Sequence, residues 1–185
     1  AAIWEPRIDR PEKPLKLKLI ADILEPYANW PNLAEETPLV QRLRRLARQL
    51  IKAIDQPNKP EQLSQAVAKL AGLGSGLTPA GDDYLIGVMA ALWLTGRLET
   101  MELIAATAIP RTNALSAAFL RAAARGQFME PWHALVEAWQ AEDKPAVAAA
   151  VARIAVFGAS SGADALAGFS HTLADPGRPA IASDK

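Results

Sequence analysis

The sequence predicts an all-α fold, a multi-helix array around a buried central helix at about residues 81–97. Three observations favour this fold. From residue 37 onward, apolar residues recur at helical spacing, and no segment alternates in the way that a half-buried strand does. Proline and glycine divide this region into pieces of helix length. A chain of 185 residues is also long enough to bury one packed core without a metal or a disulfide.

The composition excludes several classes of protein. Lys and Arg number 20 and so do Asp and Glu, so the chain has no basic surface of the kind that binds nucleic acid. The longest uncharged stretch, residues 84–96, is shorter than the roughly 18 apolar residues that span a bilayer. The absence of cysteine excludes a thiol nucleophile. We therefore expect a cytoplasmic protein with neither nucleic acid nor a membrane as its partner.

The chain is expected to form one helical domain over residues 15–174, with an extended arm at 1–14 and a flexible tail at 175–185. Three prolines among charged residues predict the arm, since proline and the residue before it disfavour helix. Residues 15–25 permit a short strand, but their apolar residues continue at helical spacing and favour a helix. Because Ala1 stands in place of a methionine, we expect the chain to be the C-terminal part of a longer parent protein.

Two amphipathic helices are predicted next. Thr37 and Pro38 are typical of an N-cap and a first helical residue, and apolar residues follow on one stripe as far as Ile54. Basic residues off this stripe form either an interaction surface or, as we favour, a solvated face. They are Arg42, Arg44, Arg45, Arg48 and Lys52. The second helix begins at Pro60 and gives way to Gly72.

The central helix carries apolar residues nearly all the way round, which is typical of a helix buried in the middle of a domain. Gly96 is expected to end it. The frequent alanines of the later chain allow helices to approach one another closely. Further helices are predicted at Leu98–Ile109, Thr112–Arg125, Pro131–Glu142, Pro145–Phe157 and Gly162–Ala174.

The segment before the central helix is a candidate anion site. Gly72, Gly74 and Gly76 allow a ligand to approach the backbone closely. Thr78 and Pro79 are typical of a helix start, where free N–H groups bind phosphate or carboxylate. Neither a P-loop nor a dinucleotide-binding fingerprint is present. The alternative is a plain connection between two helices. The expected ligand-binding residues are Gly74, Ser75, Gly76, Leu77 and Thr78.

Two acids follow at the start of the central helix. Asp82 and Asp83 suit the helix dipole, but they repel an anion bound at the same place. Either they serve only as electrostatic caps, or a cation joins them to the ligand. Magnesium fits the second interpretation, because it prefers one or two carboxylates together with water and phosphate oxygens.

A later segment repeats the pattern of the first. Residues 81–87 and 162–168 share the sequence G-x-D-x-L-x-G. The acid and the last glycine of each copy share one helix face, which suggests that another backbone lies against that face. We infer a pseudo-twofold pair of helices with Asp83 and Asp164 at one shared site. Chance similarity in a chain rich in alanine and glycine is the alternative.

These segments resemble the signatures of a known family. The residues that carry the resemblance are Gly-Leu-Gly-Ser-Gly-Leu-Thr-Pro-Ala-Gly-Asp-Asp-Tyr-Leu-Ile-Gly at 72–87 and Ser-Ser-Gly-Ala-Asp-Ala-Leu-Ala-Gly at 160–168. The family is bacterial, was long regarded as of unknown function, and includes the oxamate carbamoyltransferase subunit of anaerobic allantoin breakdown. Residues 111–116 and 126–130 extend the resemblance. Its members usually carry an additional N-terminal portion.

The resemblance implies transfer of a carbamoyl group between oxalurate and phosphate, which gives oxamate and carbamoyl phosphate. Such a site binds phosphate and a small carboxylate, and Arg111 beside a helix cap at Thr112 is the implied carboxylate clamp. Asp83 and Asp164 are the implied catalytic residues, which orient a nucleophile or, with Asp82, hold a metal. The other implied binding residues are Ser116, Ser160, Ser161 and Gly162.

The resemblance also implies partners, namely a small anionic substrate and the other subunits of a carbamoyltransferase complex. The sequence shows no convincing activated nucleophile or base. Carbamoyl transfer can proceed through positioning and electrostatic stabilisation alone, so an enzyme is not excluded. The alternative function is a non-catalytic subunit that binds an anion or assembles a metabolic complex.

The two histidines are weaker candidates. His133 shares a helix face with apolar residues, which favours packing. His171 follows Asp164 by about two helical turns on the same face. It is therefore either a packing residue or a group whose proton moves near neutral pH.

Overall fold

The computed structural model describes residues 5–11, 14–31 and 37–174, and within them the chain is helical with no β-strand. The predicted all-α fold is confirmed. The tail expected at 175–185 lies outside the described residues. Three short 3-10 helices lie at Leu17–Leu19, Glu25–Tyr27 and Ile109–Arg111. The α-helices of this part are α1 (Ala21–Leu24), α2 (Pro38–Ile54), α3 (Pro60–Leu70), α4 (Ala80–Leu94), α5 (Leu98–Ala108), α6 (Ala114–Ala123), α7 (Glu130–Gln140), α8 (Lys144–Ala155) and α9 (Ser161–Leu173).

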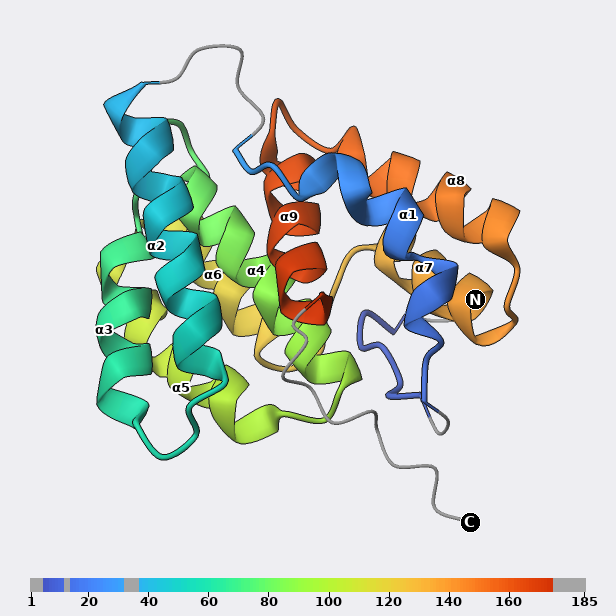
Figure 1. Cartoon of the computed structure of the whole chain (residues 1–185), viewed down its shortest axis with the longest axis horizontal. Helices are drawn as coiled ribbons and strands as arrows, with labels where there is room; N and C mark the ends of the chain where they lie inside the picture. The colour runs from blue at the N-terminus through green and yellow to red at the C-terminus, as the bar shows by residue number, and fades with distance from the viewer. Residues whose placement is uncertain (1–4, 12–13, 32–36, 175–185) are drawn as a thin grey trace.

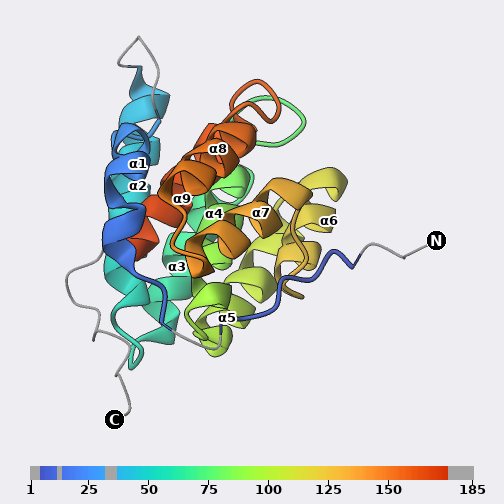
Figure 2. The same ribbon diagram turned by 90° about the vertical axis from the view of Figure 1, so that its right-hand side faces the viewer.

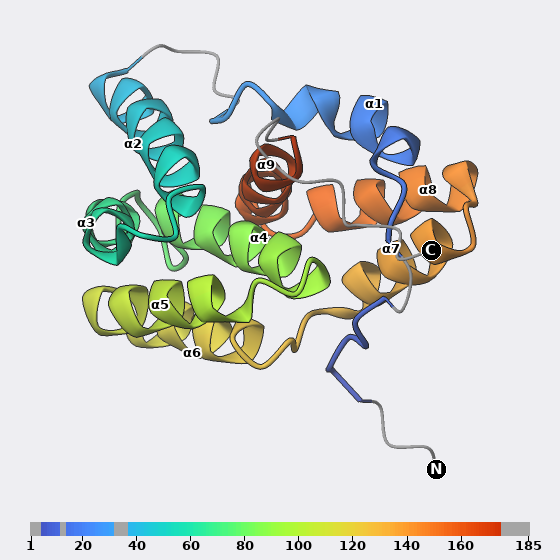
Figure 3. The same ribbon diagram turned by 60° about the horizontal axis from the view of Figure 1, so that its bottom comes forward.

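Helix α4 is the predicted central helix (Figure 1). Its apolar side chains point in all directions, and Leu85, Val88 and Met89 have no exposed surface. Figure 3 shows α9 on one side of α4 and the α5–α6 pair on the other, with α2 and α3 towards one end of the array and α7 and α8 towards the other. Although α4 is apolar all round, no helix in the described residues has both the length and the apolar composition needed to cross a membrane.

The first two predicted helical regions differ in regularity. Thr37 caps α2 as expected, because its hydroxyl accepts a hydrogen bond from the Val40 N–H at 3.2 Å. Residues 15–25 form no strand, but the single helix favoured there is broken into a 3-10 turn at Leu17–Leu19 and the one turn of α1. Helical spacing of leucines therefore identified the type of structure in this region but not its length.

Two of the predicted caps are wrong. Pro79, and not Thr78, holds the cap position of α4, and the Thr78 hydroxyl bonds to a side chain at the start of α9. Asn113, and not Thr112, caps α6, because the Asn113 side chain accepts a hydrogen bond from the Ser116 N–H at 3.0 Å. Both threonines are adjacent to the true cap, and both are used in tertiary hydrogen bonds instead.

The described part of the N-terminal arm is extended and bound to the domain (Figure 2). The Ile8 N–H donates to the Gly126 carbonyl at 2.9 Å, and the Ile8 carbonyl accepts from the indole N–H of Trp93 at 2.9 Å. His133 Nε2 lies 3.1 Å from the Pro6 carbonyl. These contacts attach the arm to the end of α4 and to the helix α7, and they give His133 a structural role.

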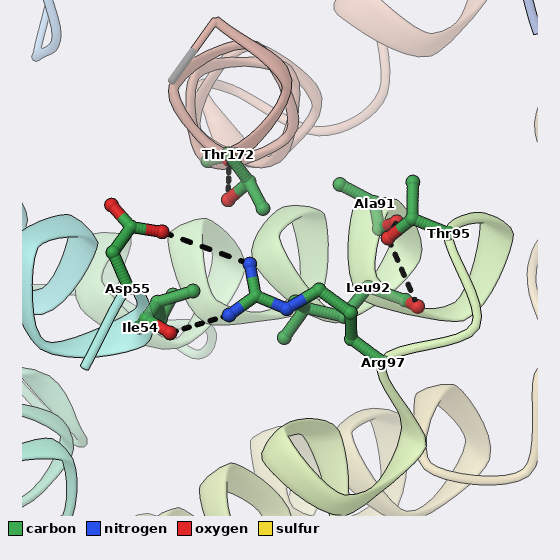
Figure 4. Close-up of polar contacts among 8 residues, drawn as sticks. Ile54, Asp55, Ala91, Leu92, Thr95, Arg97 and Thr172 are labelled. Carbon is green, nitrogen blue, oxygen red and sulfur yellow. Dashed lines mark hydrogen bonds and ion pairs between the residues drawn. The ribbon is translucent and has the colours of Figure 1, made fainter. Parts of the chain in front are cut away.

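Polar contacts hold the C-terminal end of α4 (Figure 4). Arg97 donates to the Ile54 carbonyl at the end of α2 and lies 3.8 Å from the Asp55 carboxylate. The Thr95 hydroxyl donates to a carbonyl one turn earlier at 2.7 Å. Gly96 follows with a φ of 71°, a left-handed conformation that favours glycine. The predicted end of the central helix at Gly96 is confirmed.

Candidate functional site

Helices α4 and α9 touch backbone to backbone. A Cβ atom added at Gly87 on α4 would lie 1.7 Å from the Ala165 carbonyl oxygen, and one added at Gly168 on α9 would lie 2.0 Å from the Tyr84 carbonyl oxygen. Both distances are far below van der Waals contact, so only glycine permits this approach. The contacts are reciprocal, since each glycine meets the residue that follows the acid of the other signature. This reciprocity is what a pseudo-twofold pair requires.

The first glycine of each signature makes an equivalent contact with the preceding helix. An added Cβ at Gly81 would lie 2.1 Å from the Leu70 carbonyl oxygen at the end of α3. An added Cβ at Gly162 would lie 1.8 Å from the Ile154 carbonyl oxygen near the end of α8. The repeated G-x-D-x-L-x-G sequence is therefore one packing unit used twice.

The packing unit brings two acids together at the starts of α4 and α9. Asp83 and Asp164 are each only 5% exposed. The hydroxyl groups of Thr78 and Ser161 lie 2.9 Å apart and join the two helix starts by a hydrogen bond. The negative charge of Asp164 is near enough to raise the pKa of Asp83. These four side chains form one polar cluster.

Asp83 has one satisfied and one unsatisfied oxygen atom. Its Oδ2 atom is buried and has no hydrogen-bond partner in the described chain. Burial is the main cause that raises the pKa of the Asp83 carboxyl to about 6, against the lowering effect of the Ser161 and Thr78 hydroxyls. The charges of Asp164 and Asp82 also act to raise it. Asp83 is thus mostly ionised at neutral pH but is a stronger base than an ordinary carboxylate.

Asp164 has a donor that Asp83 lacks. The indole N–H of Trp30 donates to Asp164 Oδ1 at 2.6 Å. Burial raises the pKa of Asp164, whereas Trp30 and the hydroxyl of Ser160 lower it. Its Oδ2 atom is buried without a partner in the described chain. Trp30 lies far from Asp164 in the sequence, so the sequence analysis missed it, and no local pattern indicates the contact.

A small network holds Trp30 in place. Its ring packs on the Tyr84 ring with centroids 4.3 Å apart. The Tyr84 hydroxyl lies 2.8 Å from His171 Nδ1, and His171 Nε2 lies 2.8 Å from the Ala28 carbonyl. Because a carbonyl oxygen only accepts, Nε2 carries a proton and donates to Ala28. Burial lowers the pKa of His171, which favours the neutral ring, and in that ring Nδ1 accepts from the Tyr84 hydroxyl.

A cavity of about 250 Å³ lies beside Asp83. Four predicted site residues line it, namely Thr78, Asp83, Ser161 and Gly162. Most of the remaining lining is apolar and includes aromatic side chains from α6, from α7 and from the end of α8. These are Phe119, Trp132 and Phe157. No lysine or arginine occurs among the described residues that line the cavity.

The other residues of the glycine loop lie outside the lining of this cavity. The N–H groups of residues 74–78 donate to no group within the described part of the chain. Gly74 and Gly76 have φ values of 132° and 93°, which only glycine adopts readily. The Asn113 side chain donates to the Leu77 carbonyl at 2.9 Å and ties the loop to the start of α6. The loop thus presents its N–H groups, Ser75 among them, next to the polar cluster.

Three further predicted residues also lie outside the cavity lining. The exposed Arg111 guanidinium donates to the Thr107 carbonyl of α5 at 2.6 Å. Ser116 is buried in the first turn of α6, and its hydroxyl has no partner in the described chain. Ser160 lies directly before α9, beside Asp164.

Asp82 makes a different contact from Asp83. Its Oδ1 atom accepts from the Gly72 N–H at 2.8 Å, and its Oδ2 atom accepts from the Thr112 hydroxyl at 2.5 Å. Among the described residues, no group of three or more acids and histidines is placed to hold a metal ion. The expected arrangement of Asp82, Asp83 and Asp164 around one metal is therefore not assembled. That one or two of these carboxylates bind a magnesium ion stays a prediction.

The sequence matches the family described as oxamate carbamoyltransferase subunit AllH over residues 70–173, which is more than half of the chain. The chain belongs to this family. As an AllH-family member it is a subunit associated with carbamoyl transfer, and other subunits are its partners. The matched range runs from the last residue of α3 to the last residue of α9 and contains both glycine signatures. No solved structure matches the chain.

Proposed function

We propose that this AllH-family chain supplies the acid–base group for carbamoyl transfer between carbamoyl phosphate and oxamate. The observation that carries the proposal is Asp83, a buried carboxylate beside a cavity, with a free oxygen atom and a pKa raised to about 6. An unpartnered buried carboxylate destabilises a fold, and such groups occur preferentially where they take part in chemistry.

The reaction needs a proton acceptor. The amide nitrogen of oxamate attacks the carbonyl carbon of carbamoyl phosphate, so that a C–N bond forms and the C–O bond to phosphate breaks. Oxalurate and phosphate are the products, and the proton that the nitrogen loses passes to the Asp83 carboxylate. Its pKa of about 6 is suited to this role, because Asp83 is ionised at neutral pH and still binds a proton better than an ordinary acid.

The surroundings of Asp83 support the same chemistry. Apolar lining residues such as Phe119 and Trp132 limit the access of water, which would otherwise hydrolyse the carbamoyl group. The hydroxyls of Thr78 and Ser161 bond to each other, and the one whose proton is not used in that bond would turn from Asp83 to the carbamoyl oxygen, on which negative charge develops.

The proposal assigns the anions to the segments around the cavity. The free N–H groups of residues 74–78 would bind the phosphate, and Arg111 would pair with the carboxylate of oxamate. A magnesium ion, if the reaction uses one, would be held by the free Oδ2 atoms of Asp83 and Asp164.

The test measures oxalurate and phosphate formed from carbamoyl phosphate and oxamate by the chain in complex with the other subunits. Asp83→Asn is expected to lower kcat by about 100-fold or more without loss of assembly. Asp22→Asn is the matched control, because Asp22 is an exposed acid that pairs with Lys144 and lies outside the cavity lining. Full activity of the Asp83→Asn complex would contradict the catalytic proposal and favour a non-catalytic, assembly role.

A further inference from the structure

The large apolar side chains that stay exposed in the described chain are concentrated beside the cavity. Seven are exposed, and five of them lie on the glycine loop, on α6 and directly after α8. Leu77 is 80% exposed and Val156 is 79% exposed. Contiguous apolar surface of this kind marks a binding surface more often than plain solvent-facing surface. We call these five residues the mouth patch; they are Leu77, Leu115, Phe119, Val156 and Phe157.

Contacts place the three segments of the mouth patch side by side. Phe119 and Phe157 both line the cavity. Asn113 at the start of α6 donates to the Leu77 carbonyl, and the hydroxyl bond to Ser161 joins the glycine loop to the start of α9. Figure 2 shows the glycine loop, in green, next to the orange loop between α8 and α9. The three segments of the patch therefore lie beside the cavity, and two of the five side chains line it.

The polar cluster under this patch carries negative charge without a cation. Asp83 and Asp164 each keep one buried oxygen atom without a partner in the described chain. The described residues that line the cavity include neither lysine nor arginine. Carbamoyl phosphate and oxamate are both anions, so transfer at this place needs a positive charge that the described lining does not supply.

We infer that another subunit of the same enzyme docks on the mouth patch and directs a lysine or arginine side chain into the cavity. The inference rests on the proposed function, because the anionic substrates create the need for a cation, and Arg111 lies outside the cavity lining. Apolar side chains of that subunit cover the patch, and its cation pairs with the bound phosphate. A second copy of this chain fits the site less well, since its own patch would bring the same apolar side chains and no positive charge.

The first test compares two double variants of the full chain. Val156→Gln with Leu115→Gln removes apolar surface from the patch, and Leu17→Gln with Leu39→Gln removes exposed apolar surface elsewhere. All four side chains are exposed, so both variants are expected to keep the melting temperature of the wild type. Sedimentation with the other purified subunits is expected to show association weakened about tenfold or more by the patch variant only.

The second test measures the binding of inorganic phosphate by calorimetry to the chain alone, to the other subunits alone and to the complex. A cation that the docked subunit directs into the cavity is expected to tighten phosphate binding about tenfold or more on assembly. Phosphate binding that is no tighter in the complex than in its separate parts would overturn the inference.

The outcomes distinguish this inference from the proposed function. If the patch variant assembles as tightly as its control, the docking inference is wrong. It is also wrong if the patch variant changes only the sedimentation of the chain by itself, because a second copy then covers the patch. If assembly depends on the patch and tightens phosphate binding, but the complex forms no oxalurate, docking stands and the proposed substrates are wrong.

Discussion

The α3–α4 half and the α8–α9 half of the repeat correspond at the signature positions, because each places a glycine, an acid, a leucine and a second glycine in the same helical register. Leu85 and Leu166 are both fully buried, and the glycines of both halves meet backbone carbonyls. The acids differ. Each keeps one oxygen atom without a partner in the described chain, but Asp164 receives the indole N–H of Trp30, whereas Asp83 lines the cavity.

This difference shows that the repeated backbone contacts determine where each acid lies, while the neighbours of the acid determine what it can do. Trp30 comes from outside the repeat and has only one of the two acids within reach of its N–H group. The carboxylate that Trp30 binds becomes part of the scaffold. Asp83, to which Trp30 does not donate, is the candidate base.

The largest effect is expected from adding one carbon atom to the shared packing unit. Gly87→Ala and Gly168→Ala are each expected to destabilise the chain by more than about 3 kcal/mol. The new Cβ would overlap a backbone carbonyl of the facing helix, which cannot move aside as a flexible side chain does. Urea unfolding at neutral pH measures the loss in the free energy of unfolding.

Gly76→Ala is the control for these variants, since the space around Gly76 is open and only its φ of 93° opposes alanine. Its cost is expected to be about 1–2 kcal/mol. Equal losses at Gly76 and Gly87 would show that α4 and α9 separate easily, and that their close approach does not hold the acids together.

A smaller effect is expected where the two halves differ. Trp30→Phe keeps most of the ring but removes the N–H group that donates to Asp164 Oδ1. Because this leaves a buried carboxylate short of a hydrogen bond, we expect a loss of about 2–3 kcal/mol at neutral pH. Trp139→Phe is the matched control, since its N–H donates to the uncharged Lys16 carbonyl, and about 1 kcal/mol is expected there. A loss for Trp30→Phe no larger than the control would mean that the indole does not stabilise the acid.

The smallest effect in our series is a gain in stability. An acid whose pKa is higher in the folded chain than in the unfolded chain takes up protons on folding between pH about 4 and 6. Asp83 therefore contributes most to the free energy of unfolding below pH about 4, and this contribution falls as the pH rises from about 4 to 6. Asp83→Asn is expected to raise the free energy of unfolding by about 1–2 kcal/mol at pH 7.5 and to give no gain at pH 4.

Urea unfolding of wild type and Asp83→Asn at several pH values measures this difference. If Asp83 merely caps α4, the variant is instead expected to lose about 0.5–2 kcal/mol over the whole range. Such a loss would remove the contrast between the two acids, since both would then be structural.

The fold was largely predictable because its signals are local. An apolar surface all round residues 81–97 predicts a buried helix, and Gly96 and Thr37 mark helix ends in any surroundings. The errors arose where tertiary contacts outweighed local preference. Thr78 and Thr112 are good capping residues, but each donates or accepts a hydrogen bond across the fold instead.

The site was predictable only as far as the repeat extends. The repeated pattern placed Asp83 and Asp164 together, and the structure adds the hydrogen bond that joins two other predicted residues, Thr78 and Ser161. The assignment of Asp82 to the same metal followed from its position in the chain, but consecutive helical residues point about 100° apart. The apolar cavity wall and Trp30 belong to elements without any repeated pattern, so only the packing of the whole chain reveals them.

The double hydrogen bond of Asp82 has a consequence for how the glycine loop moves. One carboxylate holds the Gly72 N–H, where the loop begins, and the Thr112 hydroxyl, just before α6. A shift of the loop therefore cannot extend into α3 unless these two hydrogen bonds of Asp82 break. The two bonds fix the base of the loop against α4 and α6, and the N–H groups of residues 74–78, which have no partner in the described chain, lie beyond this fixed base.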